Sequence, residues 1–369
     1  MDVDELDRLR GAAPPRSHNA RTIAALTGNP GCNRRAVLDA AGVDKQQLAA
    51  HLGFPTRFGQ SQFAIARGNA FEAQVKAGGG VELLRLLAER LGLPVPDARY
   101  LDLASDTAGG LAARSSRAMR LLAGALAGAG DAGTLLDHPL LTLDVAGRQV
   151  YLEPDLIALE LGGRLHVVEI KSFAVIDGQA DAAKVAAAAM QSAVYVLALR
   201  QCLRRAGADP LTVSDQVVLI CPEDFANHPV ATLVDVRRQL AVLRRQLARM
   251  ERIDSLLAAL PDGCTVDLCP DTAGVPTRPV VELAATMEHL PARYLPSCLA
   301  ACELAYFCRH QAGDATAALG HQVREALGGV DRVSTVLRFA AGAGPVPEEQ
   351  AEAAALLRAA AALRAEAIG

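Results

Sequence analysis

The spacing of apolar and polar positions predicts that the first 130 residues are largely helical. A helical pattern runs from Cys32 to about Ala41, and Gly42 can serve as its stop, because glycine readily adopts the left-handed conformation that ends a helix. Three further helices are expected over about 60–77, 81–91 and 112–128. The first thirty residues are expected to form a short helix followed by an irregular stretch that contains proline.

The pattern changes between about 139 and 176. Three runs have strand character, LLTLDVAGRQV, YLEPDLIALE and RLHVVEIKSF, and short gaps that contain glycine separate them. Such gaps suit hairpins, so a three-stranded meander is expected. A long Ala-rich helix (180–206), a buried strand (216–222) and another helix (232–259) are expected to follow. This order predicts a mixed α/β core, followed by a cysteine-rich segment and an Ala- and Leu-rich tail.

The composition favours a globular protein of one or two domains, because 51% of the 369 residues are hydrophobic. The sequence contains no stretch of about 18 uninterrupted apolar residues, so no membrane span is expected. The charged first residues, MDVDELDRLR, lack the apolar centre of a signal peptide. A cytoplasmic protein that does not engage a membrane is therefore predicted, in which the eight cysteines are free thiols or metal ligands rather than disulfides.

The net charge of −4 gives no global sign of a nucleic-acid partner, so any such surface would be local. The basic residues are almost all arginine. Only four lysines occur, namely Lys45, Lys76, Lys171 and Lys184. Their rarity makes the position of each lysine more informative.

One of these lysines belongs to the run Glu169-Ile170-Lys171. If residues 165–171 form a strand, Glu169 and Lys171 share one face with Leu165 and Val167. A carboxylate and a lysine on an otherwise apolar face are unfavourable to bury without a purpose. The alternative is an ordinary surface salt bridge on an edge strand.

Asp155 lies near the start of the preceding strand and reaches Glu169 in a hairpin only if the register permits, which the sequence leaves open. Carboxylates and a lysine suit phosphodiester hydrolysis. Carboxylate oxygens bind Mg²⁺ or Mn²⁺ with open water positions, and the metal lowers the pKa of a bound water. A nearby lysine stabilises the transition-state charge and orients the water.

Two further elements surround this run. RGNAFEAQV (67–75) lies on a predicted helix upstream, and Gln191 and Tyr195 lie four residues apart on the helix after the meander. Residues at that spacing share a helix face, so both can point at one site. Taken alone, they would be read as a polar Gln and a half-buried Tyr of an ordinary helix.

Together these residues resemble the RecB-like branch of the PD-(D/E)XK nucleases. That family carries G-x-x-x-(H/E) on a helix, Asp at a strand start, (D/E)-x-K on the next strand and Q-x-x-x-Y on the following helix. The matching residues are Gly68 with Glu72, Asp155, Glu169 with Lys171, and Gln191 with Tyr195.

The resemblance implies a restriction-endonuclease-like α/β core with large helical additions, and an Mg²⁺- or Mn²⁺-dependent deoxyribonuclease acting on single strands or DNA ends. It assigns Glu72, Asp155, Glu169 and the Ile170 carbonyl as metal ligands. Lys171 would be the catalytic lysine, and Gln191 and Tyr195 would position the DNA or the site. Many members carry His at the position of Glu72.

A second constellation is formed by Cys298, Cys302 and Cys308. Cys298 and Cys302 lie one helical turn apart, and Cys308 can add a third ligand to the same site. A closed tetrahedral or cubane site needs a fourth thiolate. The candidates for it are Cys32, Cys202, Cys264 and Cys269.

The run CNRRAVL from Cys32 resembles the N-terminal cysteine segment of the iron–sulfur RecB-like nucleases, which include CRISPR-associated adaptation nucleases and AddB-type nuclease domains. The resemblance implies a 4Fe–4S cluster on Cys32, Cys298, Cys302 and Cys308. The usual C-x2-C-x5-C spacing is C-x3-C-x5-C here, a departure at Cys298. Zinc in the same site, and buried thiols without metal, are the alternatives. The nuclease domain would cover 1–312, and 313–369 would form a helical tail.

Arginines recur along the expected helix over 232–259, mostly on one side. They are Arg237, Arg238, Arg244, Arg245, Arg249 and Arg252. Arg244 and Arg245 are the predicted DNA contacts, since phosphate recognition is largely electrostatic; a solvated helix face is the alternative. Arginines nearer the N-terminus are equally ambiguous, namely Arg34, Arg35, Arg57 and Arg67.

These features predict a DNA nuclease of repair, CRISPR adaptation or phage defence. No G-x-x-x-x-G-K-(S/T) phosphate loop is present, so strand separation would require a helicase or another repair or defence partner. The alternative is a non-catalytic DNA-binding or scaffold subunit that keeps the fold. The acidic residues with Lys171 argue against it, because a scaffold needs no lysine beside carboxylates.

Overall fold

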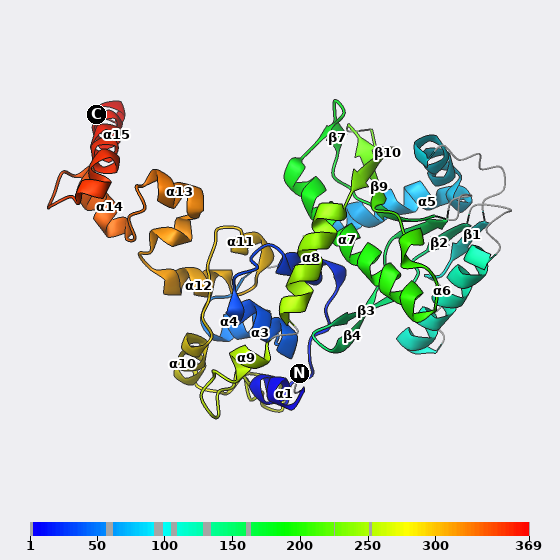
Figure 1. Cartoon of the computed structure of the whole chain (residues 1–369), viewed down its shortest axis with the longest axis horizontal. Helices are drawn as coiled ribbons and strands as arrows, with labels where there is room; N and C mark the ends of the chain where they lie inside the picture. Colours follow the sequence, from blue (N-terminus) through cyan, green and yellow to red (C-terminus); the bar gives the residue numbers. More distant parts are fainter. Residues whose placement is uncertain are drawn as a thin grey trace. The chain divides into compact units, whose positions relative to one another are not determined.

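The computed structural model describes residues 3–56, 62–91, 99–104, 109–127, 134–159, 164–224, 226–250 and 253–368. The chain packs as two compact units (Figure 1). Unit 1 comprises Met1, Arg16–Thr27 and Gly59–Asp254, and unit 2 comprises Asp2–Pro15, Gly28–Phe58 and Ser255–Gly369. The nuclease domain over 1–312 and the tail over 313–369 stay predictions, because this division follows packing and not activity.

Unit 1 is built on a mixed β-sheet with strand order β1-β2-β5-β6-β9-β7-β8, and β10 also pairs with β9. The pairs β1–β2 and β6–β9 are parallel, whereas β2–β5, β5–β6 and β9–β10 are antiparallel. The strands are β1 (Arg99–Asp102), β2 (Thr134–Asp137), β5 (Leu156–Leu159), β6 (Leu165–Ile170), β7 (Val175–Ile176), β8 (Gln179–Ala180), β9 (Gln216–Glu223) and β10 (His228–Asp235). The predicted mixed α/β fold class is confirmed.

Two helices cover opposite faces of this sheet, α5 (Gln62–Leu91) and α7 (Ala182–Arg205) (Figure 1). Successive residues of β9 alternate between them. Val218 and Ile220 belong to the core that includes α5, whereas Leu219 and Cys221 pack with α7. The remaining helices of unit 1 are α2 (Ala20–Leu26), α6 (Gly110–Ala127), η1 (Pro210–Thr212) and α8 (Arg237–Met250).

The backbone of α5 leaves helical geometry at Ala77, and Gly78, Gly79 and Gly80 have positive φ. Such φ values suit glycine, which has no Cβ to clash. The two helices expected over 60–77 and 81–91 are therefore confirmed as the two halves of α5, although residues 60 and 61 lie outside the described residues.

The predicted three-stranded meander is wrong. Residues 141–152 form a separate hairpin of β3 (Leu141–Val145) and β4 (Arg148–Leu152), and only β5 and β6 enter the main sheet. Ala146 and Gly147 both have positive φ, which suits a tight two-residue hairpin turn. Between β4 and β5, Pro154 lacks the N–H that a continuous ladder needs, so the chain changes sheets there.

The helix expected over 232–259 is also corrected. Its first residues belong to β10, which pairs with β9 along its whole length, and the helix α8 begins only at Arg237. The β-branched residues Val230, Thr232 and Val234 alternate along β10 and favour a strand. After α8 the chain continues into the one-turn helix α9 (Asp254–Leu257).

Among the described residues, α7 is the one helix whose length and composition would allow it to cross a membrane. Half of its most apolar window is buried, and α7 packs on α2, α8 and the hairpin strand β3. This packing is that of a core helix in a folded unit. The cytoplasmic location stays a prediction.

Unit 2 is helical over most of its described residues. Its helices are α1 (Val3–Arg10), α3 (Asn33–Ala41), α4 (Lys45–His51), α10 (Val280–His289), α11 (Cys298–Ala301), α12 (Ala305–Ala312), η2 (Thr316–Leu319), α13 (His321–Ala326), α14 (Val333–Ala340), η3 (Glu348–Gln350) and α15 (Ala351–Ile368). Gly42 ends α3 with a φ of 70°, as predicted. The last helices enclose a small apolar core of their own around Phe339 and Ala354.

Candidate active site

The register of two neighbouring strands brings Asp155 beside Glu169. Leu156 of β5 pairs with Val168 of β6 in an antiparallel ladder, so the residues just before and just after them lie at the same end. The Ile170 N–H donates a 2.7 Å hydrogen bond to Asp155 Oδ2. The register that the sequence left open is therefore the one that joins the two carboxylates.

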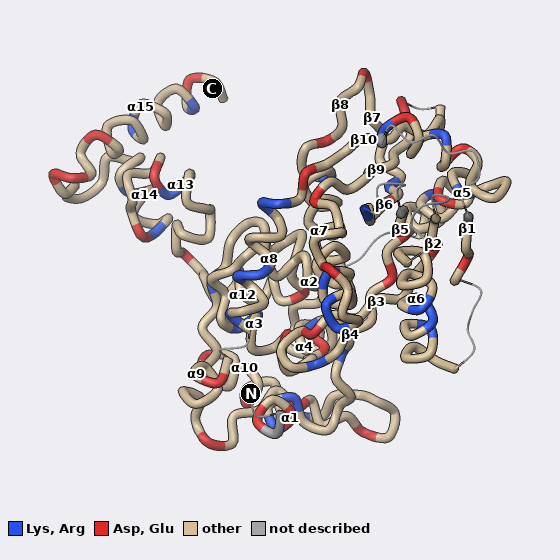
Figure 2. Tube along the Cα trace, turned by 45° about the vertical axis from the view of Figure 1, so that its right-hand side comes forward, with Lys and Arg blue, Asp and Glu red and all other residues tan. Residues whose placement is uncertain are grey.

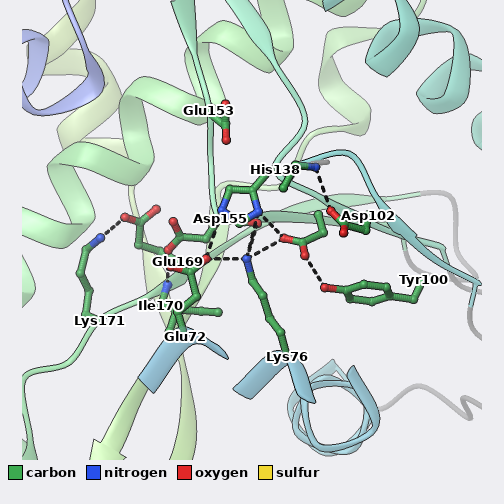
Figure 3. Close-up of polar contacts among 12 residues, drawn as sticks. Glu72, Lys76, Tyr100, Asp102, His138, Glu153, Asp155, Glu169, Ile170 and Lys171 are labelled. Carbon is green, nitrogen blue, oxygen red and sulfur yellow. Dashed lines mark hydrogen bonds and ion pairs between the residues drawn. The ribbon is translucent and has the colours of Figure 1, made fainter. Parts of the chain in front are cut away.

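Glu169 is fully buried and only half satisfied. Lys171 Nζ donates to Oε1, whereas Oε2 has no hydrogen-bond partner (Figure 3). Burial and, after it, the nearby Asp155 charge raise the pKa of Glu169 to about 8, against the opposing effect of Lys171. Burial also raises the pKa of Asp155. The pair is short of positive charge, which is the environment that a divalent cation would correct.

Lys171 lies at the end of β6, with a quarter of its side chain exposed. Burial lowers the pKa of Lys171, but the carboxylates of Glu169 and Asp155 more than offset this and raise it. The ammonium group therefore stays charged, with one side on Glu169 and another open to solvent.

Glu72 lies on the first half of α5, close enough for its charge to raise the pKa of both Asp155 and Glu169. Its own contacts differ from theirs. Glu72 Oε1 lies 2.5 Å from Lys76 Nζ and 3.2 Å from His138 Nε2. Burial alone would raise the pKa of Glu72, but the hydrogen bonds from His138 and Lys76 hold it at about 2. The charge of Glu72 thus acts on the other two predicted carboxylate ligands, whereas Glu72 Oε1 is paired with Lys76 and His138.

The residues that pair with Glu72 form a network that the sequence did not reveal (Figure 3). Lys76 Nζ donates to Asp137 Oδ1 at 2.6 Å, and the Tyr100 hydroxyl donates to Asp137 Oδ2. His138 Nδ1 lies 2.8 Å from Asp137 Oδ1, and its bonds to Asp137 and Glu72 raise the pKa of His138 to about 10. Lys76 offered a signal, as a rare lysine one helical turn from Glu72.

Gln191 and Tyr195 share a face of α7, as their spacing predicted. Gln191 Nε2 donates a 3.3 Å hydrogen bond to the Tyr195 hydroxyl. Tyr195 is buried, and burial together with the charge of Glu169 raises the pKa of its hydroxyl. The pair therefore faces the same carboxylates.

The predicted DNA contacts Arg244 and Arg245 lie on α8, and both are exposed. On the same helix Arg237 is engaged by Asp235, and Arg252 lies outside the described residues. The helix α8 itself packs on α7. Arg57 also lies outside the described residues, whereas Arg67 donates to the Ser172 carbonyl beside Lys171.

In unit 2, three of the four predicted cluster cysteines meet. Cys32 and Cys298 lie close enough to Cys308 for their charges to add to the effect of burial, which raises the pKa of the Cys308 thiol. Cys302 follows one turn after Cys298, and its N–H donates to the Cys298 carbonyl. Burial raises the pKa of the Cys302 thiol to about 12, against the opposing effect of Lys45 and Arg35.

Donors and cations from the segment around Cys32 face these thiols. Asn29 Nδ2 donates to Cys298 Sγ and Arg34 donates to Cys308 Sγ, both at 3.2 Å. Arg34, Arg35 and Lys45 are all buried. The ambiguous Arg34 and Arg35 are therefore not surface contacts for DNA.

The remaining candidates for a fourth ligand have other surroundings. Cys202 belongs to unit 1, where Thr142 of β3 hydrogen-bonds its sulfur. Cys269 is exposed, with Arg278 beside its sulfur, and Cys264 is partly buried. Within the described ranges, no three His, Cys, Asp or Glu side chains are arranged to hold a single metal ion. Glu72 would have to leave Lys76 and His138 to join Asp155 and Glu169 on one ion.

Comparison of the chain with known proteins identifies no family. No protein-family model matches the sequence, and no curated protein matches it either. The functional argument therefore depends on the site itself.

Proposed function

We propose that this protein is a metal-dependent deoxyribonuclease of the PD-(D/E)XK type, in which Asp155 and Glu169 hold the metal and Lys171 acts in catalysis. The observation that carries the proposal is the buried, unpaired Oε2 of Glu169 opposite Asp155. A buried carboxylate oxygen without a partner is unfavourable unless something else satisfies it. Hard oxygen ligands of this kind fit Mg²⁺ or Mn²⁺.

A restriction-endonuclease-like core of the RecB-like branch belongs to the same proposal. Support comes from the antiparallel hairpin β5–β6, the parallel neighbour β9, and the helix α7 that follows the catalytic strand. These elements carry Asp155, Glu169 and Gln191 toward one end of the sheet. The helix α5 adds Glu72 from the opposite face.

A divalent cation on Asp155 and Glu169 would lower the pKa of a bound water and neutralise charge on the attacked phosphate. Lys171 is held by Glu169 and keeps its charge, so it can orient the attacking water and stabilise the developing oxyanion. Tyr195, on which the charges of Glu169 and Asp155 act, is bonded to Gln191, and the two residues would help to position the DNA or the site. The Ile170 N–H holds Asp155 in place, and the Ile170 carbonyl would supply a further ligand.

The cysteines of unit 2 are proposed to hold a 4Fe–4S cluster through Cys32, Cys298, Cys302 and Cys308. Their surroundings fit thiolate ligands, because N–H donors reach two of the sulfurs and buried cations flank the group. The cluster would tie two segments more than 260 residues apart and stabilise the fold rather than act in catalysis. Zinc is the rival occupant, and it is distinguished by the absence of colour.

The test is digestion of end-labelled single- and double-stranded DNA with Mn²⁺ or Mg²⁺, by protein purified without oxygen. The matched variants are Lys171→Ala and Lys184→Ala, because Lys184 is exposed at the start of α7. We expect cleavage by the wild type and by Lys184→Ala, and its loss in a folded Lys171→Ala protein.

Failure of the wild type to cleave any DNA form, in folded and brown protein, would favour the scaffold alternative. Addition of a helicase or another repair or CRISPR partner would then decide whether the enzyme needs an activator. Equal activity in Lys171→Ala and the wild type would remove Lys171 from the mechanism.

A further inference from the structure

A small pocket adjoins the network around Glu72. Its lining residues are Leu103, Arg114, Arg117, His138 and Leu140. The two leucines are buried and form an apolar floor. Arg114 and Arg117 lie one turn apart on α6, among the basic residues that Figure 2 marks on this helix. The pocket thus combines two guanidinium groups with the wall of an imidazole, whose two nitrogens face Asp137 and Glu72.

Arg114 is oriented before any ligand binds. One terminal nitrogen donates a 3.1 Å hydrogen bond to Glu153 Oε2, and 17% of its side chain is exposed. Its Nε is buried and has no hydrogen-bond partner. A guanidinium fork that is fixed in this way suits an anion, because its terminal nitrogens match the oxygens of a phosphate.

His138 connects this pocket with the candidate active site. Its ring lines the pocket, and its Nε2 lies 3.2 Å from Glu72 Oε1. The backbone there is unusual for a non-glycine residue, with a φ of 50°, and its N–H donates to the Asp155 carbonyl. Such conformations concentrate at functional sites. An anion in the pocket would therefore lie next to the carboxylates and not at a remote surface.

We propose that Arg114 and Arg117, beside His138, form a phosphate subsite that binds a second phosphodiester of the DNA strand, next to the one that is cleaved. This inference rests on the proposed nuclease function, because it takes the ligand of the carboxylate site to be nucleic acid. Binding of a neighbouring phosphate would fix the strand and place the scissile bond over Asp155 and Glu169. Glu153 acts as the positioning residue for Arg114.

The test uses Arg117→Gln, because Arg117 is exposed and its replacement leaves the packing of α6 intact. Arg120→Gln is the matched control on the same helix, exposed and outside the pocket lining. Binding of a single-stranded oligonucleotide is measured in EDTA at several salt concentrations. We expect Arg117→Gln to reduce the slope of log K against log salt by about 0.7, the loss of one single-strand phosphate contact. Equal effects of Arg117→Gln and Arg120→Gln would overturn the proposal.

A methylphosphonate scan locates the contact on the DNA. Neutralising one linkage at a time should weaken binding to the wild type at one position, and that penalty should disappear in Arg117→Gln. The same scan with Arg114→Lys, which keeps the charge but loses the fork, should reduce the penalty in part. A scan in which no linkage depends on Arg117 would contradict the subsite.

The ligand source and the underlying function are separated by two further measurements. Calorimetric binding of inorganic phosphate that is lost in Arg117→Gln, together with a scan in which no DNA linkage depends on Arg117, would assign the pocket to free phosphate and overturn the strand-binding role. DNA binding with the expected linkage dependence but without cleavage would support the subsite and reject the nuclease. Cleavage of DNA without the expected linkage dependence would support the nuclease and reject the subsite. A wild type that neither binds nor cleaves DNA would reject the nuclease and the subsite.

Discussion

The carboxylate site of unit 1 and the cysteine group of unit 2 both bury acidic side chains, but they differ in how those side chains are paired. Burial raises the pKa of Asp155 and Glu169, and it likewise raises the pKa of Cys302 and Cys308. At the carboxylates, Glu169 Oε2 has no hydrogen-bond partner. At the cysteines, Arg34 donates to Cys308 Sγ, and Lys45 and Arg35 oppose the effect of burial on Cys302. The carboxylates therefore keep a charge deficit, which a bound cation would correct.

The largest effect is expected from Cys308→Ser. Cys308 is the thiol on which Cys32, Cys298 and Arg34 converge, so its loss would remove the cluster and the link between two distant segments. We expect loss of the absorption band near ~400 nm and a clear drop in the thermal stability of unit 2. Absorption spectra and thermal denaturation of anaerobically purified protein provide the measurement.

Cys269→Ser is the matched control for this change. Cys269 is exposed and lies outside the group, so this variant should keep the band and the wild-type stability. If the wild type is colourless and binds zinc, the occupant of the site is zinc and not an iron–sulfur cluster, but the thiolates still serve as metal ligands. A Cys308→Ser protein with the full band would contradict the assignment of Cys308.

The next largest effect concerns the buried lysines, which compensate carboxylates in both units. Lys45 pairs with Asp39 and Glu303, and Lys76 pairs with Glu72 and Asp137. Removing one partner of a buried ion pair costs about 3–5 kcal/mol, because the other charge stays buried. Lys45→Met and Lys76→Met should each destabilise their own unit by about this amount in urea denaturation. If the loss of stability in Lys45→Met or Lys76→Met is as small as in the exposed Lys184→Met, water already solvates these ion pairs.

Glu169→Gln tests the charge deficit directly through pH. The unfolded chain loses the Glu169 proton near 4.5, whereas the folded protein without metal keeps it until about 8. Between these values the folded state binds more protons, so stability falls as pH rises. We expect this decline in thermal denaturation of the wild type in EDTA, and a flatter profile in Glu169→Gln.

Two comparisons isolate Glu169 in that experiment. The raised pKa of His138 gives a decline of the same sign, but only above its unfolded value of 6.5. The slope between pH 5 and 6 therefore reports Asp155 and Glu169 together, and its difference between the wild type and Glu169→Gln reports Glu169. Glu223→Gln changes an exposed carboxylate at the end of β9 and should keep the wild-type profile. Mn²⁺ should stabilise the wild type more than Glu169→Gln. An identical pH profile in the wild type and in Glu169→Gln would show that Glu169 has no charge deficit.

The sequence predicted the carboxylate pair better than the residues around it. The apolar run over 165–170 was enough to predict β6 and to place Glu169 and Lys171 on one face, because the alternation of side chains along a strand is a local property. The Lys76–Asp137 contact was not predictable, since it joins residues 61 positions apart and depends on the placement of β2. Tertiary contacts of this kind leave no periodic signal.

Two errors have local causes. The strand β10 was taken for the start of a helix, although Val230, Thr232 and Val234 alternate, because the arginine-rich helical pattern of α8 follows directly. The meander prediction counted β3 and β4 into the main sheet, since a hairpin has the same pattern in either sheet. Around the cysteines, the neighbours of Cys32 carried the signal, because Arg34 follows it by two residues and binds Cys308.

The smallest effect is expected from Arg244→Glu combined with Arg245→Glu. These residues are exposed, so their contacts with phosphates would be screened by salt, unlike the buried charges of either site. If they contact DNA, the double reversal should reduce the salt slope of single-strand binding by about 1.4, or about 0.7 for each phosphate. The measurement is the same oligonucleotide titration in EDTA that tests Arg117.

The matched control is Arg358→Glu combined with Arg364→Glu, which makes the same charge change on exposed positions of α15. A general effect of net charge would appear equally in both double variants, because long-range repulsion does not depend on contact. A specific DNA surface on α8 requires the larger change in Arg244→Glu with Arg245→Glu. Equal slopes would make α8 a solvated helix face and leave α6, with Arg114 and Arg117, as the basic element that serves the carboxylate site.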